Sequence, residues 1–148
     1  MSAEPRVAAI RFLLRAFGAV DCLALIAVLM PRAVIESASL RLGFAPFSPG
    51  PLAEYLARST SLLYALHGAL MLYVASDVPR HWGLIRCLGL LAVVHGVLML
   101  MIDVRIGMPG WWCAIEGPTF AASGIALWML TNRGEETEQE RTEATENL

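Results

Sequence analysis

Four ionisable side chains lie inside otherwise apolar stretches of the sequence: Asp21, His67, His95 and Glu116. An ionisable group near the centre of a bilayer costs about 2.5 to 3.5 kcal/mol on insertion scales, so such groups pair with one another or line a polar cavity. We therefore predict that these four residues form an intramembrane polar site. Two further charged residues, Arg58 and Asp103, are expected near the outer mouth of that site.

The two histidines begin a repeated phrase, HGALML at His67 and HGVLML at His95. Both lie at similar distances from the turn expected at Asp77–His81, which places them at similar depth on antiparallel helices and allows a duplicated hairpin. Facing inward, they can ligate haem b, hold a quinone, relay a proton, or hydrogen-bond to nearby acids. Because helices packed about 8 to 10 Å apart leave no slot for a porphyrin, we expect no cofactor or metal. We expect the histidines to be hydrogen-bonded to polar groups of the bundle such as Asp21 or Tyr64.

Glu116 is followed by Gly117 and Pro118. Pro118 cannot donate a hydrogen bond to the carbonyl of Ala114, so the helix is expected to be weakened beside a carboxylic acid. Interrupted helices beside polar groups occur at transport sites, although a proline kink packed inside a bundle is commoner. For Asp21 the ordinary alternative is a pairing that only holds the bundle together.

These residues must be positioned by membrane-spanning helices. Hydrophobic residues make up 57% of the 148 residues, more than the ~45 to 50% that is typical of soluble domains. Four continuous apolar stretches approach the ~20 residues that a helix needs to cross a bilayer: Val7–Met30, Ala57–Ser76, Trp82–Ile102 and Trp112–Leu130. Continuous runs favour helices over barrel strands, so we predict an all-α, integral membrane four-helix bundle over residues 1–132.

Arginine placement predicts the orientation of the spans. With the N-terminus inside, the cytoplasmic side receives Arg6, Arg11, Arg15, Arg80, Arg86, Arg133 and Arg141. The outer side receives Arg32, Arg41, Arg58 and Arg105. We therefore predict a multi-pass protein of the bacterial inner membrane with both termini in the cytoplasm. Because charged residues interrupt the first span, we expect an uncleaved anchor and not a signal peptide.

The connection between the first two spans carries helix signals of its own. Pro31 stands at an expected first turn, Val34 and Leu42 lie on one apolar face, and Gly43 is an expected stop. We predict a short helix on the membrane surface, followed by an irregular proline-rich stretch in which Phe44 and Phe47 dip into the interface. Residues 133–148 are acidic and nearly devoid of apolar side chains, which predicts a flexible cytoplasmic tail, solvated and disordered or fraying as a helix.

Small residues recur at helical spacing in the last span: Ala114, Gly117, Ala121 and Gly124. Ala92 and Gly96 form a similar pair in the third span. Such residues let helices approach closely, either within the bundle or between subunits. The three cysteines are isolated and are expected to be packing residues, and no phosphate loop, nucleophile elbow or basic tract for nucleic acid is present in the sequence.

The outline resembles the small DoxX-like four-helix membrane proteins: Arg15 and Gly18 early in the first span, Pro31 closing it, a surface segment, and Glu116 in the last span. The resemblance implies the same architecture and carries over no residue roles. We expect an accessory or interaction subunit, not an enzyme, with the bilayer and a membrane complex or a homo-oligomer as partners. The alternatives are a redox or proton-coupled protein that uses His67 and His95, and an oligomeric transporter of a small solute.

Overall fold

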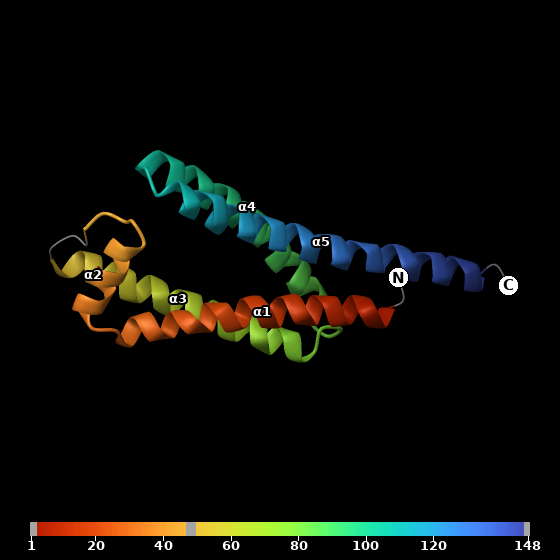
Figure 1. The fold of residues 1–148 in the computed structure, drawn as a ribbon. Coiled ribbons are helices and arrows are strands. Elements are labelled where there is room, and N and C mark those ends of the chain that lie inside the picture. Colours follow the sequence, from red (N-terminus) through yellow and green to blue (C-terminus); the bar gives the residue numbers. More distant parts are fainter. Residues whose placement is uncertain (1–2, 47–49, 147–148) are drawn as a thin grey trace. The chain divides into compact units, whose positions relative to one another are not determined.

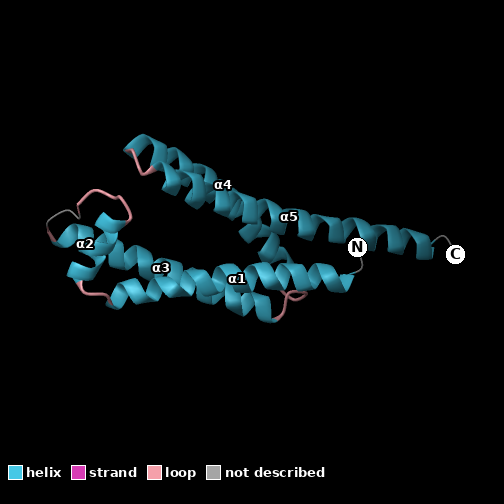
Figure 2. Cartoon of the chain, in the orientation of Figure 1, coloured by secondary structure: helices cyan, strands magenta, loops and turns pink. Residues whose placement is uncertain are grey.

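The computed structural model describes residues 3–46 and 50–146, and all regular structure in these ranges is helical. Figures 1 and 2 show the helices in chain order: α1 (Ala3–Leu29), α2 (Arg32–Arg41), α3 (Pro51–Ser76), α4 (Trp82–Ile106) and α5 (Gly110–Glu146). The predicted all-α class is confirmed.

Three helical segments of the described chain are long and apolar enough to cross a membrane: Glu4–Leu29, Trp82–Ile106 and Gly110–Asn132. Only 17% of the most apolar window of each is buried within the protein, so most of these apolar side chains are available to lipid or to other helices. These properties indicate a membrane protein. The predicted span Ala57–Ser76 lies in α3, which has 26 residues but is not among these three segments. The first half of α3 carries the polar residues Glu54, Arg58 and Ser59.

A short helix is present where the sequence predicted one between the first two apolar stretches. Pro31 directly precedes the ten-residue α2, and its carbonyl accepts hydrogen bonds from the N–H groups of Val34 and Ile35. The helix ends at Arg41, and Gly43 follows with a φ of +82°, which favours a residue without a side chain. None of the residues of α2 is buried. Phe47, expected at the interface, lies outside the described residues.

Helix α5 runs past the predicted span Trp112–Leu130 and into the acidic segment. It begins just after Gly107, which ends α4 with a φ of +73°, and after Pro109. It continues through Pro118 and through the acidic segment to Glu146. Glutamate, glutamine, arginine and alanine are good helix formers, which accounts for the continuation of the helix past Asn132.

The chain divides into two compact units. The first, Leu14–Ser76, holds most of α1 together with α2 and α3, and is called the α1–α3 unit. The second joins Met1–Leu13 to Asp77–Leu148, holds the start of α1 with α4 and α5, and is called the α4–α5 unit. Among the described residues, the fully buried apolar side chains are Leu14, Val74 and Ala75 in the first unit, and Ile10, Val78, Ile85 and Leu127 in the second.

Helices α1 and α3 touch through glycines. A β-carbon placed on Gly68 would lie 2.6 Å from the carbonyl oxygen of Gly18, and one placed on Gly18 would lie 2.9 Å from that of Gly68. Side chains essentially never approach backbone so closely, so both positions require glycine at this separation of the helices. Close contact through small residues is the usual way in which membrane helices gain packing energy.

Helices α4 and α5 run side by side and touch through two glycine pairs (Figure 1). Gly96 faces Gly117, and Gly89 faces Gly124. A β-carbon on Gly124 would lie 2.5 Å from the carbonyl oxygen of Gly89, and one on Gly96 would lie 2.5 Å from the backbone nitrogen of Ala121. The small-residue stripe of the last span is therefore used within the chain, against α4.

The packing also bears on the repeated phrase. Its first copy lies in α3, the second helix of the α1–α3 pair, whereas its second copy lies in α4, the first helix of the α4–α5 pair. A tandem duplication of a hairpin would put the phrase on the same helix of each pair. The repeat instead marks two separate glycine crossings, at Gly68 and Gly96.

Candidate functional site

The crossing of α1 and α3 brings two of the predicted site residues together. Asp21 follows Gly18 by one helical turn, and His67 directly precedes Gly68. A carboxylate oxygen of Asp21 lies 2.7 Å from Nδ1 of His67. Asp21 is only 9% exposed, whereas the His67 side chain is 37% exposed. The pair thus consists of a buried acid and a partly accessible imidazole within apolar helices.

The hydrogen bond fixes how the imidazole can act. When Nδ1 carries its proton, it donates to the Asp21 carboxylate, and Nε2 is left as the acceptor. Over residues 3–46 and 50–146, no hydrogen bond to Nε2 of His67 is present. A carboxylate that holds a histidine through Nδ1 is the arrangement found behind metal-bound and proton-transferring histidines. The pair can therefore accept a proton, accept a hydrogen bond, or ligate a metal ion, in each case through the lone pair of Nε2.

Cys22 packs beside this pair. Its thiol lies 3.8 Å from the carbonyl oxygen of Ala65, which stands two residues before His67 on α3. The three cysteines are all free thiols. The contact of Cys22 is a packing contact across the α1–α3 crossing, since a thiol is a weak donor.

His95 has different surroundings although it begins the same phrase. Its ring packs edge-on against Phe120, with 4.8 Å between the ring centroids and 75° between the planes. Phe120 follows Gly117 by three residues, just as Asp21 follows Gly18, so the two phrases build similar crossings with different neighbours. The first copy places an acid beside the histidine, and the second places an aromatic ring there.

His67 belongs to the α1–α3 unit and His95 to the α4–α5 unit. A cofactor site that combines them stays a prediction, as does a single polar cavity that includes Asp21 and Glu116. No group of three or more histidine, cysteine or acidic residues that could hold a metal ion occurs in the described part of the chain.

Glu116 accepts a hydrogen bond from the indole Nε1 of Trp112, one turn earlier on α5. Trp112 in turn packs edge-on against Trp111, at 5.4 Å between ring centroids. The spacing of four residues between tryptophan and glutamate is the sequence signal that would have found this contact.

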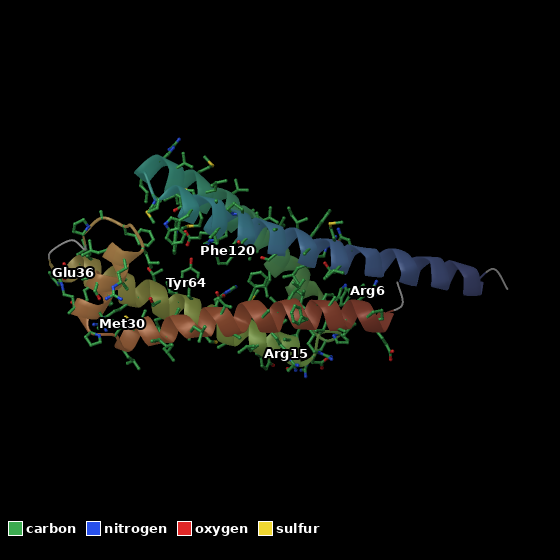
Figure 3. The ribbon with its side chains drawn as sticks, viewed as in Figure 1. Arg6, Arg15, Met30, Glu36, Tyr64 and Phe120 are labelled. Atoms are coloured by element: carbon green, nitrogen blue, oxygen red, sulfur yellow. The ribbon has the colours of Figure 1, made fainter. Side chains whose placement is uncertain are left out.

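Arg58, predicted at an outer mouth, is engaged within its own unit. Its guanidinium donates to the carbonyl oxygens of Val28 and Met30, the latter at 3.0 Å, and pairs with Glu54 at 2.8 Å. Figure 3 labels Met30 at the end of α1. A cation that binds the free carbonyls at a helix C-terminus satisfies their hydrogen bonds and complements the helix dipole. Arg32 lies 3.8 Å from the same glutamate, so Glu54 links α2 to the start of α3.

Asp103, the other predicted partner, lies one turn before the end of α4. It is 2% exposed, and its Oδ2 has no hydrogen-bond partner among the described residues. Its backbone carbonyl accepts hydrogen bonds from the N–H groups of Gly107 and Met108, which closes the helix end. Its position is therefore part of the turn between α4 and α5.

Comparison with known proteins adds no assignment: no protein-family model, curated protein or solved structure matches the chain. The candidate site therefore rests on its own chemistry, and the Asp21–His67 pair is its best-defined part.

Proposed function

We propose that this chain is a four-span integral membrane protein that works by proton exchange at the Asp21–His67 pair. The fourth span is α3, whose 26 residues are long enough to cross a ~30 Å hydrocarbon core. Its close packing against α1 supports this placement, because α1 is itself long and apolar enough to span. The DoxX-like outline supports the same count, with α2 lying on the membrane surface.

The span count gives a prediction about topology. Single cysteines at Ala45 and Arg80, introduced into a chain whose three native cysteines are replaced by serine, should react from opposite sides of the membrane. The external label should reach Ala45, because the predicted orientation places α2 outside. The nearby loop residue Ser48 could also carry a reporter, but it lies outside the described residues. If α3 did not cross, both positions would react from one side, and reporters at the two termini would lie on opposite sides.

The observation that carries the proton proposal is the 2.7 Å contact between His67 Nδ1 and a buried carboxylate, together with a partly exposed imidazole. Protonated, the pair is an imidazolium and a carboxylate with no net charge. Deprotonated, it carries one negative charge inside an apolar helix pair. Because a charge in the bilayer is costly, the two states differ strongly in how they interact with lipid, water and neighbouring helices.

The experiment counts protons. Protein in lipid nanodiscs is titrated over about pH 5 to 8, the range in which histidine charge changes. Wild-type protein should take up about one proton more than His67→Gln. Equal uptake by wild-type protein and His67→Gln would show that the histidine stays in one state and holds the helices together without exchanging protons.

The accessory or interaction role expected from the sequence is the second candidate. It is supported by the many large apolar side chains that the spans expose, for example Phe12 on α1 at 71%. These faces can pack against other membrane helices as well as lipid. A haem or quinone protein and a small-solute transporter are further alternatives. A visible absorption spectrum separates the haem protein from the rest, because we expect the purified protein to be colourless.

A further inference from the structure

One face of α5 places an acid between two aromatic rings. Trp112, Glu116 and Phe120 are each four residues apart on this continuous helix, so their side chains lie nearly in line, about 6 Å apart along the helix axis. All three residues are half-buried. They belong to the α4–α5 unit, as does His95, and the proton site in the α1–α3 unit uses none of them.

The rings on both sides of the acid are held by contacts with their neighbours. The indole N–H of Trp112 donates to the Glu116 carboxylate, and Trp111 packs edge-on against that indole. Phe120, which is labelled in Figure 3, packs edge-on against His95 of α4. A ligand that binds between the rings therefore does not have to order these side chains, which lowers the entropy cost of binding.

The depth of the acid in the membrane narrows the class of ligand. Glu116 is the seventh residue of α5, so it stands about 9 Å from the start of the apolar segment Gly110–Asn132, which is long enough to span. A carboxylate at this depth is costly unless hydrogen bonds or a cation accompany it. A small inorganic ion would have to lose its water there, whereas a cation that carries apolar groups is stabilised by apolar surroundings.

We infer that Glu116 and its two flanking rings bind an amphipathic organic ammonium ion near the start of α5. The carboxylate supplies the opposite charge, and aromatic rings within ~6 Å attract a cation through the ring quadrupole. Tryptophan is the strongest such ring, and aromatic side chains around a quaternary ammonium are a common means of recognising that group.

A divalent metal ion matches this site less well. Ca²⁺ takes about 6 to 8 oxygen ligands, whereas the rings on either side of Glu116 offer none. Over residues 3–46 and 50–146, no group of three or more histidine, cysteine or acidic residues could hold a metal ion. The surroundings of the acid therefore favour an organic cation.

The test compares two probes of nearly the same shape, phenyltrimethylammonium and its uncharged counterpart tert-butylbenzene. Each is equilibrated with the full chain in phosphatidylcholine nanodiscs, and binding is the excess over empty nanodiscs. Wild-type protein should bind the ammonium ion saturably and in excess over tert-butylbenzene. Glu116→Gln should weaken ammonium binding by about tenfold or more, because an amide carries no charge but still accepts the indole hydrogen bond.

Further variants separate charge from folding. Glu116→Asp keeps the charge and should retain most of the selectivity for the ammonium ion. Phe120→Leu keeps an apolar side chain but removes one ring, and should weaken ammonium binding about two- to fivefold. The matched control is Asp77→Asn, which removes an exposed acid of the same unit from the turn before α4 and should bind as wild type does.

Three results would overturn the inference: equal binding of the two probes by wild-type protein, unchanged ammonium binding by Glu116→Gln, or an equal loss in Asp77→Asn. The first would mean that the rings take up apolar molecules regardless of charge. The inference goes beyond proton exchange at the Asp21–His67 pair, which is measured separately, so either can fail while the other holds.

Discussion

Replacing Gly96 with leucine is expected to separate α4 from α5 and to destabilise the α4–α5 unit by about 3 kcal/mol or more. A β-carbon at this position already meets the backbone of Ala121 at 2.5 Å, so a branched side chain can be accommodated only if the helices move apart. That movement also pulls Gly89 away from Gly124. The loss is measured as a fall in the thermal midpoint of the purified protein, followed by circular dichroism in detergent.

The matched control is Gly83→Leu in the same helix, because a β-carbon at Gly83 meets no atom within 4 Å. This variant should unfold at or slightly above the wild-type temperature, since leucine is a better helix former than glycine. If Gly96→Leu and Gly83→Leu behaved alike, the close crossing of α4 and α5 would be wrong.

The second large effect is expected at the Asp21–His67 pair. His67→Leu leaves the 9% exposed carboxylate of Asp21 without its partner and should cost about 2 to 3 kcal/mol. This lies below the ~3 to 5 kcal/mol of a fully buried broken pair, because the histidine is partly exposed. Adding Asp21→Ala to His67→Leu removes the unpaired acid and should recover most of the lost stability.

The double-mutant cycle of wild type, the two single variants and the double variant isolates the interaction. Thermal unfolding in the same detergent supplies all four values. Additive losses, with the double variant the least stable of the four, would mean that the carboxylate and the imidazole are not coupled.

Much of the helical framework follows from local sequence. The apolar runs predicted helices at Val7–Met30 and Trp82–Ile102, and the structure has helices over Ala3–Leu29 and Trp82–Ile106. Proline and glycine at Pro31 and Gly43 predicted the short α2, because these residues act through their own backbone geometry. The end of α5 was harder to predict, since the loss of hydrophobicity after Asn132 marks the end of a span but not the end of a helix.

The partners of the site residues could not be predicted in the same way. The sequence predicted Asp21 as one possible hydrogen-bond partner of His67, and the structure has this contact. The sequence did not show which helices touch. That depends on Gly18 and Gly68, whose missing side chains set the distance and register of the crossing. The spacing of small residues shows that they share one face of a helix. It does not show which other helix packs against that face. For Arg58 the spacing from Glu54 was visible, whereas its bonds to the carbonyls of α1 required the fold.

The central claim is that Asp21 holds the His67 imidazole through Nδ1 while Nε2 exchanges a proton. Nitrogen NMR of labelled histidine in lipid bilayers observes both ring nitrogens directly, and His67→Gln assigns the signals. We expect Nδ1 to stay protonated throughout a pH titration, Nε2 to gain and lose a proton during it, and Asp21→Asn to change the signal of Nδ1, which loses its carboxylate partner. A His67 signal that keeps one protonation state across the range, or an Nδ1 without a proton at neutral pH, would contradict it.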